Sequence, residues 1–181
     1  MRRHLAVFDW NGTLLDDLEA SLVACNEVFK AFGCAPITLN ALRHNFTFPL
    51  IHFYTRMGID TDCFLKDIDR LKEIYLKSYN REVIHCSLRS GAAETLKWLN
   101  ARGWECMVLS NHVQSMLEED LRRTGVYDCF QHISGNPYDA DISRTMNKHE
   151  RLKAYMEGKG YAPSDCLITG DSFEEIDLGR D

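Results

Sequence analysis

A carboxylate, an amide and a hydroxyl follow one another closely near the start of the chain. Residues 5–8 are apolar, and Asp9, Asn11, Gly12 and Thr13 come within the next few positions. A short apolar run followed by a turn signal predicts a buried parallel strand. Such a strand delivers Asp9 to its carboxyl end, where open α/β sheets bind their ligands. A carboxylate in that position is suited to act as a nucleophile in phosphoryl transfer.

Polar side chains also lie at the boundaries of three later segments. Ser110 and Asn111 end a second apolar run, and Lys148 opens a segment of helical character. Asp171 follows a fourth strand-like run, and Glu175 comes shortly after it. Strand ends of a parallel sheet lie at one edge, so these residues are expected to lie near Asp9.

In this order, the four groups resemble the motifs of the haloacid dehalogenase-like hydrolase superfamily. Its first motif is usually Asp-x-Asp-Gly-Thr, its second is a strand ending in Ser or Thr, and a lysine opens a later helix. Its last motif is Gly-Asp-Ser-x-x-Asp-Ile. Residues 170–176 of this chain resemble that motif, with Glu175 in place of the second Asp. The resemblance spans residues 5–180 and favours the phosphoglycolate phosphatase-like group. It implies an α/β fold, a Rossmann-like parallel sheet flanked by helices, with a small helical cap inserted after the first strand.

The resemblance also implies a reaction and a metal. Asp9 would attack the phosphorus of a small phosphorylated metabolite, giving an aspartyl-phosphate that water then hydrolyses. Mg²⁺ is the hard cation suited to carboxylate, carbonyl and phosphate oxygens. Its expected ligands are the carboxylates of Asp9 and Asp171 and the main-chain carbonyl of Asn11. Glu175 is expected to bind directly or through water.

The same resemblance assigns the groups that hold the phosphoryl oxygens. Ser110 and Lys148 would stabilise the charge of the transferring group. The substrate-binding candidates that complete the set are Gly12, Thr13, Asn111 and, in the expected cap, Arg43.

Asn11 departs from the family pattern. Hydrolytic members of the family have Asp here, which protonates the leaving oxygen and then deprotonates the attacking water. An amide does neither, and general acid–base catalysis is worth about 10²–10⁴-fold. The residue therefore predicts a slow phosphatase with another base, a phosphate- or partner-binding protein, or an Asp→Asn substitution introduced to trap complexes. Asp16, Asp17 and His112 are the candidate replacement bases.

A related alternative is a phosphonoacetaldehyde hydrolase. Those enzymes carry Asp-Trp-Ala-Gly-Thr, so they resemble this chain in having the tryptophan and in lacking the second Asp. They need a cap lysine for a Schiff base. The segment from Arg56 to Asp60 resembles the one that carries this lysine only loosely, and Lys66 is the nearest lysine downstream.

Two of the assignments have structural alternatives. Ser110 could be the N-cap of a helix that begins near Val113. Lys153 lies close to Lys148, and an exposed helical lysine is the ordinary case. The distance from Lys148 to Asp171 fits the family better.

Strand-like and helical segments alternate over most of the chain. Strands are expected near 5–9, 104–110, 129–134 and 166–170, and helices at 91–102, 113–124 and 147–159. This alternation predicts a mostly parallel sheet covered on both faces. Residues 18–32 and 63–79 have apolar positions at helical spacing, and nothing between 16 and 84 alternates like a strand.

We therefore expect a core domain of residues 1–15 and 88–181 and a helical cap domain of residues 16–87. The chain ends ten residues after Asp171. The family usually continues with a helix and a further strand, so a trimmed core and a fragment are both open interpretations.

Composition limits the possible partners and the compartment. The 181 residues carry a net charge of −6 without a segment rich in Lys and Arg, which argues against nucleic-acid binding. Seven cysteines without a Cys-x-x-Cys pair favour a reducing compartment and argue against a disulfide framework or structural zinc. No apolar run reaches the length of a membrane span, so the expected location is the cytoplasm, with no membrane partner.

Overall fold

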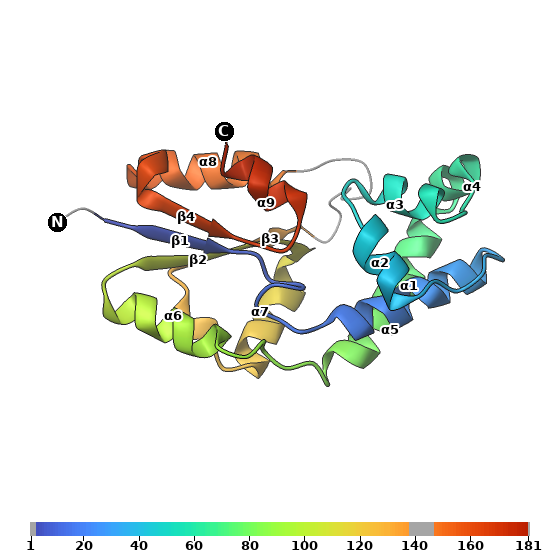
Figure 1. Ribbon diagram of the computed structural model, residues 1–181, viewed down its shortest axis with the longest axis horizontal. Helices are drawn as coiled ribbons and strands as arrows, with labels where there is room; N and C mark the ends of the chain where they lie inside the picture. The colour runs from blue at the N-terminus through green and yellow to red at the C-terminus, as the bar shows by residue number, and fades with distance from the viewer. Residues whose placement is uncertain (1–2, 138–146, 181) are drawn as a thin grey trace. The chain divides into compact units, whose positions relative to one another are not determined.

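The computed structural model describes residues 3–137 and 147–180 and divides them into two compact units (Figure 1). One unit holds residues 3–16, 87–137 and 147–180 and contains the sheet. The other holds residues 17–86 and consists of helices and the loops between them. We call them the α/β unit and the helical unit.

The α/β unit is built on a parallel sheet. Its strands are β1 (Leu5–Phe8), β2 (Glu105–Val113), β3 (His132–Asn136) and β4 (Cys166–Thr169), in the order β3-β2-β1-β4. All pairs are parallel, so the described strands end at one edge. Residues of β1 are buried throughout, as expected of an apolar central strand covered on both faces. The predicted Rossmann-like α/β fold is confirmed.

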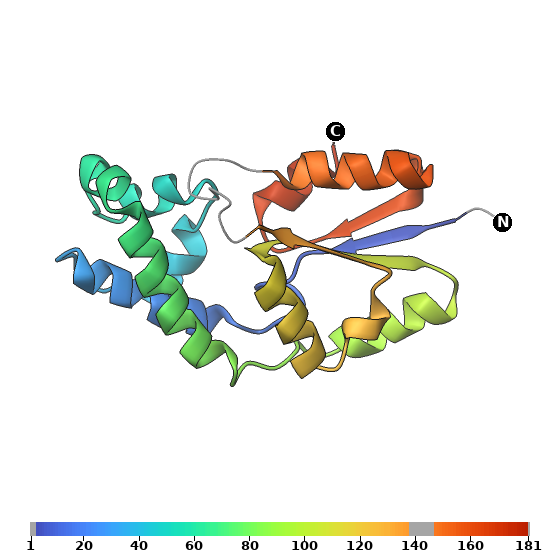
Figure 2. The same cartoon turned by 180° about the vertical axis from the view of Figure 1, so that it is seen from behind.

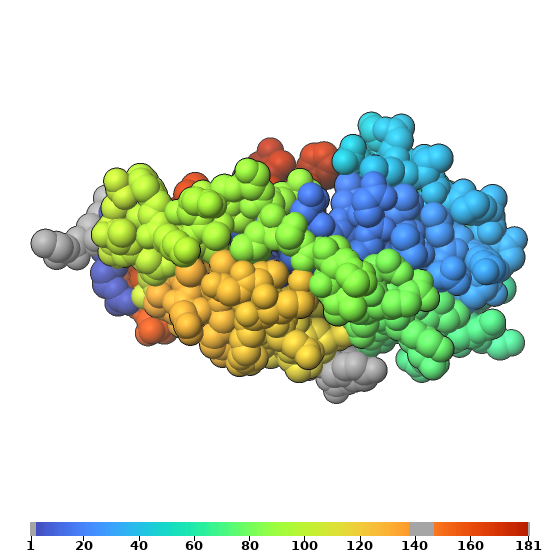
Figure 3. Space-filling model, turned by 90° about the horizontal axis from the view of Figure 1, so that it is seen from below, coloured from blue at the N-terminus to red at the C-terminus, as the bar shows by residue number. Residues whose placement is uncertain are grey.

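Helices cover both faces of this sheet. Helices α6 (Ala92–Ala101) and α7 (Gln114–Arg123) lie on one face, and α8 (Lys148–Lys159) and α9 (Phe173–Leu178) lie on the other, as the two opposite views in Figures 1 and 2 agree. In Figure 3 the yellow-green to orange atoms of the segment from α6 to η1 (Tyr127–Cys129) cover the first of these faces. A second short 3-10 turn, η2 (Pro163–Asp165), precedes β4. The face under α8 and α9 is packed by a core of Leu5, Val7, Met107, Leu109, Leu152 and Tyr161.

Most predicted boundaries hold to within a few residues, but the third strand does not begin where the sequence predicted. Residues 127–129 form the 3-10 turn η1, and β3 begins at His132 rather than near 129. Helix α7 starts at Gln114, because β2 continues to Val113 instead of ending at Ser110.

The extra length of β2 contains a bulge. Leu109 pairs with Ser134 and Val113 pairs with Asn136, so four steps along β2 match two steps along β3. The intervening segment, residues 110–112, therefore leaves the regular ladder. Bulges of this kind redirect side chains and are frequent next to functional sites.

The helical unit contains α1 (Leu18–Ala31), α2 (Leu39–Asn45), α3 (Leu50–Arg56), α4 (Thr61–Lys66) and α5 (Ile68–Val83). Its buried core is largely aromatic and includes Phe29, Phe53, Tyr54 and Phe64. The absence of strands predicted for this part is observed in residues 17–86.

Residues 63–79, which have apolar positions at helical spacing, lie in two helices instead of one continuous helix. Asp67 leaves the helical conformation, with φ −113° and ψ 26°, and separates α4 from α5. Aspartate is a poor residue for a helix interior because its side chain competes for nearby backbone groups. Asp60 does so at the start of α4, where its carboxylate accepts a hydrogen bond from the Cys63 N–H at 3.0 Å.

None of the helices in the described part of the chain is both long and apolar enough to cross a bilayer.

Candidate active site

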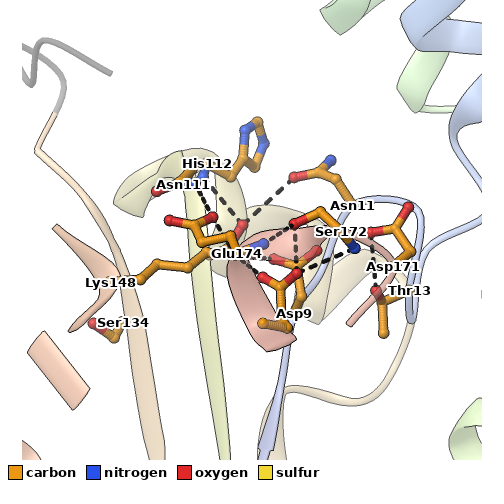
Figure 4. A network of polar contacts seen from close by, with 12 residues as sticks. Asp9, Asn11, Thr13, Asn111, His112, Ser134, Lys148, Asp171, Ser172 and Glu174 are labelled. Atoms are coloured by element: carbon orange, nitrogen blue, oxygen red, sulfur yellow. Dashed lines mark hydrogen bonds and ion pairs between the residues drawn. The ribbon is translucent and has the colours of Figure 1, made fainter. Parts of the chain in front are cut away.

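The polar residues predicted at strand ends come together at the carboxyl edge of the sheet, all within the α/β unit (Figure 4). Asp9 follows β1, Ser110 and Asn111 lie in the bulge of β2, and Asp171 follows β4. The Asp9 N–H donates to the Thr169 carbonyl at 2.9 Å, which fixes the start of the loop after β1 to the end of β4.

The loop after β1 folds tightly against Asp171. The Trp10 carbonyl accepts hydrogen bonds from the N–H groups of residues 13–15. Gly12 has φ +74°, a conformation that favours glycine, and a Cβ there would overlap the Asp171 carboxylate. The Thr13 hydroxyl donates to Asp171 Oδ1 at 3.3 Å. Asp171 therefore lies directly beside the loop that carries Asn11.

Lys148 is the lysine of this site. It is the first residue of α8, its side chain is 3% exposed, and its ammonium lies 2.8 Å from Asp9 Oδ1. The same ammonium lies 2.5 Å from Glu175 Oε1 and 3.3 Å from Glu174 Oε2. Lys153, the alternative considered from the sequence, is exposed on the same helix.

The electrostatics of the cluster are dominated by burial and by an excess of carboxylates. Burial raises the pKa of Asp9 to about 7, and the charges of Glu175 and Asp171 add to this shift, while Lys148 opposes it. Burial alone would lower the pKa of Lys148, but Asp9, Glu174 and Glu175 outweigh it and raise the pKa above its ordinary value. Burial opposes ionisation of Glu175, yet Lys148 and Ser172 lower its pKa.

The donor set fits a divalent cation. Asp9 and Asp171 offer hard carboxylate oxygens at one edge of the sheet. The carboxylates gathered there outnumber the single ammonium group of Lys148. Glu175 is engaged elsewhere: its Oε2 accepts from the Ser172 N–H at 3.2 Å and from the Ser172 hydroxyl at 2.6 Å. Within residues 3–137 and 147–180, no three His, Cys, Asp or Glu side chains form a ready-made metal cluster. Backbone oxygens, water and substrate oxygens would have to complete any coordination shell.

Glu174 is a member of the cluster that the sequence analysis missed. Its carboxylate is buried, and Oε2 accepts from the Asn111 amide at 2.8 Å, while Oε1 has no hydrogen-bond partner among the described residues. The available signal was the pair of acidic residues in the first turn of α9. Helix starts favour carboxylates, so the pair by itself indicated only a helix start.

Ser110 does not cap a helix. The N-cap position of α7 is Val113, and the Ser110 hydroxyl instead accepts a hydrogen bond from the His112 N–H at 3.1 Å. The same hydroxyl lies 3.5 Å from Asn11 Oδ1. Arg151 holds the backbone here, because its guanidinium donates to the Ser110 carbonyl at 2.8 Å and to the Ser134 carbonyl at 2.9 Å.

Two other candidates lie in the helical unit. Arg43 is exposed on α2, and its substrate-binding role stays a prediction. Lys66, the lysine named for a Schiff base, is exposed at the end of α4. The phosphonoacetaldehyde hydrolase alternative stays a prediction.

Together, fold and side chains define a Rossmann-like α/β protein with an acidic, lysine-containing site at the carboxyl edge of its sheet. The family model of the haloacid dehalogenase-like hydrolases matches residues 6–181, and the chain belongs to that family.

Individual relatives are more distant. A phosphoglycolate phosphatase from Pseudomonas putida is 24% identical over 184 residues, which cover 97% of this chain and 65% of the relative. The chain thus spans less than two thirds of that protein's length. A phosphoglycolate phosphatase from Agrobacterium fabrum is 27% identical over 184 residues, covering 97% of this chain and 76% of the relative.

Solved structures show the same fold. A haloacid dehalogenase-like family hydrolase from Streptococcus pneumoniae superposes with a TM-score of 0.81 at 19% identity, covering 99% of this chain and 80% of the other.

Proposed function

We propose that this chain is a Mg²⁺-dependent phosphatase that hydrolyses a small phosphomonoester through an aspartyl-phosphate on Asp9. The observation that carries this proposal is the position of the Asp9 carboxylate, which is buried, lies 2.8 Å from the Lys148 ammonium and follows a strand beside Asp171. A carboxylate is a known covalent nucleophile toward phosphorus. The names of the Pseudomonas and Agrobacterium relatives point to a small phosphorylated acid as the substrate class.

In the first step, an Asp9 oxygen forms a bond to phosphorus while the bond to the leaving oxygen breaks. Lys148, the Ser110 hydroxyl and the backbone N–H groups of the loop after β1 bind the phosphoryl oxygens as negative charge develops on them. In the second step, water attacks the same phosphorus, the bond to Asp9 breaks, and inorganic phosphate leaves.

The Asp9 and Asp171 carboxylates and the main-chain carbonyl of Asn11 would hold Mg²⁺, with Glu175 binding it directly or through water. The bound ion would supply positive charge that offsets the repulsion between Asp9 and a dianionic phosphate. Gly12 allows the loop to approach Asp171, and Thr13 and Asn111 keep the surrounding carboxylates in place through their hydrogen bonds.

Glu174 and Glu175 have a positioning role in this proposal. Both carboxylates contact the Lys148 ammonium, so they hold it at the edge of the sheet next to Asp9. A lysine side chain has several rotatable bonds, and fixing it beforehand lowers the entropy lost when the substrate binds.

The location proposed for this activity is the cytoplasm. All seven cysteines are free thiols in the structure, as they are expected to be in a reducing compartment.

The test is turnover of p-nitrophenyl phosphate with Mg²⁺ and with EDTA, for the unmodified chain, Asp9→Asn and Asn11→Asp. We expect Mg²⁺-dependent turnover that Asp9→Asn abolishes. Asn11→Asp introduces a carboxyl group able to transfer protons, so this variant should turn the substrate over at least as fast as the unmodified chain. Absence of turnover in both the unmodified chain and Asn11→Asp would reject the enzyme in favour of a phosphate-binding protein.

A further inference from the structure

The proposed phosphatase needs a group that moves protons, and Asn11 cannot do so. The inference in this section rests on the proposed function. Two of the three replacement bases considered from the sequence are poorly placed. The Asp17 carboxylate is buried in the helical unit, where it accepts a hydrogen bond from the Tyr79 hydroxyl at 2.7 Å. The Asp16 side chain is 58% exposed and forms an ion pair with Arg89 at 3.4 Å.

His112 belongs to the bulge that carries Ser110. It is the last residue of the β2 bulge, and its backbone N–H donates to the Ser110 hydroxyl at 3.1 Å. That hydroxyl also lies 3.5 Å from Asn11 Oδ1, so the His112 backbone and the Asn11 side chain contact the same oxygen. Figure 4 shows the imidazole ring and the Asn11 amide above Asp9, at the same side of the site.

Asp120 on α7 orients this imidazole. His112 Nε2 lies 3.7 Å from Asp120 Oδ2, and the two side chains are only 9% and 8% exposed. Arg123 holds the Asp120 carboxylate through hydrogen bonds of 2.8 Å and 3.1 Å. Burial opposes ionisation of Asp120, but the bonds from His112 and Arg123 outweigh it and lower its pKa. An immobile carboxylate beside a histidine favours one orientation of the ring.

We propose that His112 is the general acid and base of this site, in the role that Asn11 lacks, and that Asp120 is its positioning residue. When Asp9 attacks phosphorus, the His112 imidazolium donates its proton to the leaving oxygen as the phosphorus–oxygen bond breaks. The neutral imidazole then takes a proton from the attacking water as that oxygen bonds to phosphorus and Asp9 is released. One proton is given and one is regained in each turnover.

The test compares leaving groups. Phenyl phosphate and an alkyl phosphate leave poorly and need a proton donor, whereas p-nitrophenyl phosphate needs little help. His112→Ala should lower kcat for the two poor substrates by about 10²-fold or more. With p-nitrophenyl phosphate it should give a burst of one p-nitrophenolate per site, because the aspartyl-phosphate forms but water is no longer activated. Asp120→Asn should show the same dependence on leaving group with a smaller loss.

Two controls separate proton transfer from a structural effect. The double variant Asn11→Asp, His112→Ala has a new carboxyl group and should regain turnover of the poor substrates. Added imidazole should partly rescue His112→Ala. His85→Ala, at an exposed position after α5, should leave kcat unchanged.

No burst of p-nitrophenolate in His112→Ala, together with a loss of turnover that neither Asn11→Asp nor imidazole rescues, would overturn the role of His112. The proposed phosphatase would stand in that case if Mg²⁺-dependent turnover still requires Asp9. Turnover that does not depend on Asp9 would overturn both.

Discussion

At the scale of single residues, Lys148 supplies the positive charge that balances the buried carboxylates of the site. It supplies positive charge to three buried carboxylates, those of Asp9, Glu174 and Glu175. Removing one partner of a buried ion pair leaves uncompensated charge in a medium that solvates it poorly. The lysine is therefore expected to support the fold as well as the reaction.

We expect Lys148→Met, which keeps the length of the side chain and removes its charge, to lower the free energy of unfolding by about 3 kcal/mol at neutral pH. It should also lower kcat by at least about 10²-fold, because charge on the phosphoryl oxygens is no longer stabilised. Urea denaturation without Mg²⁺ measures the first effect and p-nitrophenyl phosphate turnover the second.

The matched control for this prediction is Lys153→Met on the same helix. Lys153 is exposed, and surface substitutions change stability by about 0.5 kcal/mol or less. Equal losses of stability in the two variants would show that the buried carboxylates do not depend on Lys148.

At the scale of elements, the bulge of β2 determines where Ser110, Asn111 and His112 point. Gly135 on β3 makes the bulge possible, because its backbone packs against the bulged strand. A Cβ at Gly135 would lie 2.7 Å from Gln114 Cα and 2.9 Å from the His112 carbonyl oxygen. These are backbone atoms, so they can move only if the bulge itself moves.

Gly135→Ala is therefore expected to destabilise the protein by about 1–3 kcal/mol, the usual effect of inserting a carbon into a packed region. It should also reduce turnover, since residues 110–112 are displaced. Gly158→Ala is the matched control: Gly158 is exposed on α8, where a Cβ would meet open space, and alanine there should stabilise by about 0.5–1 kcal/mol. Unchanged stability and turnover in Gly135→Ala would contradict this account of the bulge.

The opposite end of β2 is tied to α8 and the N-terminal segment by Glu105. Its carboxylate accepts hydrogen bonds from the hydroxyls of Tyr155 and Tyr161 and from Arg3, the last two at 2.8 Å and 2.9 Å. Burial opposes ionisation, but these bonds outweigh it and hold the pKa of Glu105 below its ordinary value of 4.5.

A lowered pKa gives this carboxylate a pH-dependent role in stability. The stabilisation is present above pH 4.5, the value in the unfolded chain, and is lost as the pH falls through the lower pKa of the folded state. We expect the unmodified chain to exceed Glu105→Gln in free energy of unfolding at pH 7 and the difference to shrink below about pH 4.5. Urea denaturation at several pH values measures it, and a difference that does not change with pH would contradict the prediction.

The sequence predicted those features that depend on local patterns. Apolar runs ending in polar residues located Asp9 and Asp171 just after strands, because a buried strand has a recognisable composition and its end is marked by the first polar residues. The same pattern placed Ser110 at the end of β2, where the structure has a bulge and the strand continues to Val113. The site that these ends form then follows from the parallel order of the sheet. The break at Asp67 was missed because helical periodicity continues through it.

Features that depend on contacts between distant segments could not be predicted in this way. In the bulge, four steps along β2 match two steps along β3, and no property of residues 105–113 alone indicates that mismatch. The contacts of Glu174 and the pairing of His112 with Asp120 likewise depend on how separate elements pack against each other, which local sequence does not indicate.

At the scale of the whole molecule, each compact unit has a buried core of its own. The helical unit packs around aromatic residues such as Phe29 and Phe53, whereas the α/β unit packs around aliphatic residues of β1 and β2. The carboxylates proposed to bind Mg²⁺ all belong to the α/β unit. The effect of the metal on stability should therefore be local to that unit.

We expect Mg²⁺ added to EDTA-treated protein to slow amide hydrogen exchange in β1, β4 and the loops that follow them, while exchange in α1 and α5 stays the same. A ligand stabilises the states that bind it, and opening of the α/β unit separates Asp9 from Asp171, whereas opening of a helical-unit element leaves both carboxylates in place. Exchange measured by mass spectrometry resolves the two units. Asp171→Asn removes one proposed ligand and should abolish the protection, and equal protection in α1 and α5, or none in β1, would contradict a metal bound by these carboxylates.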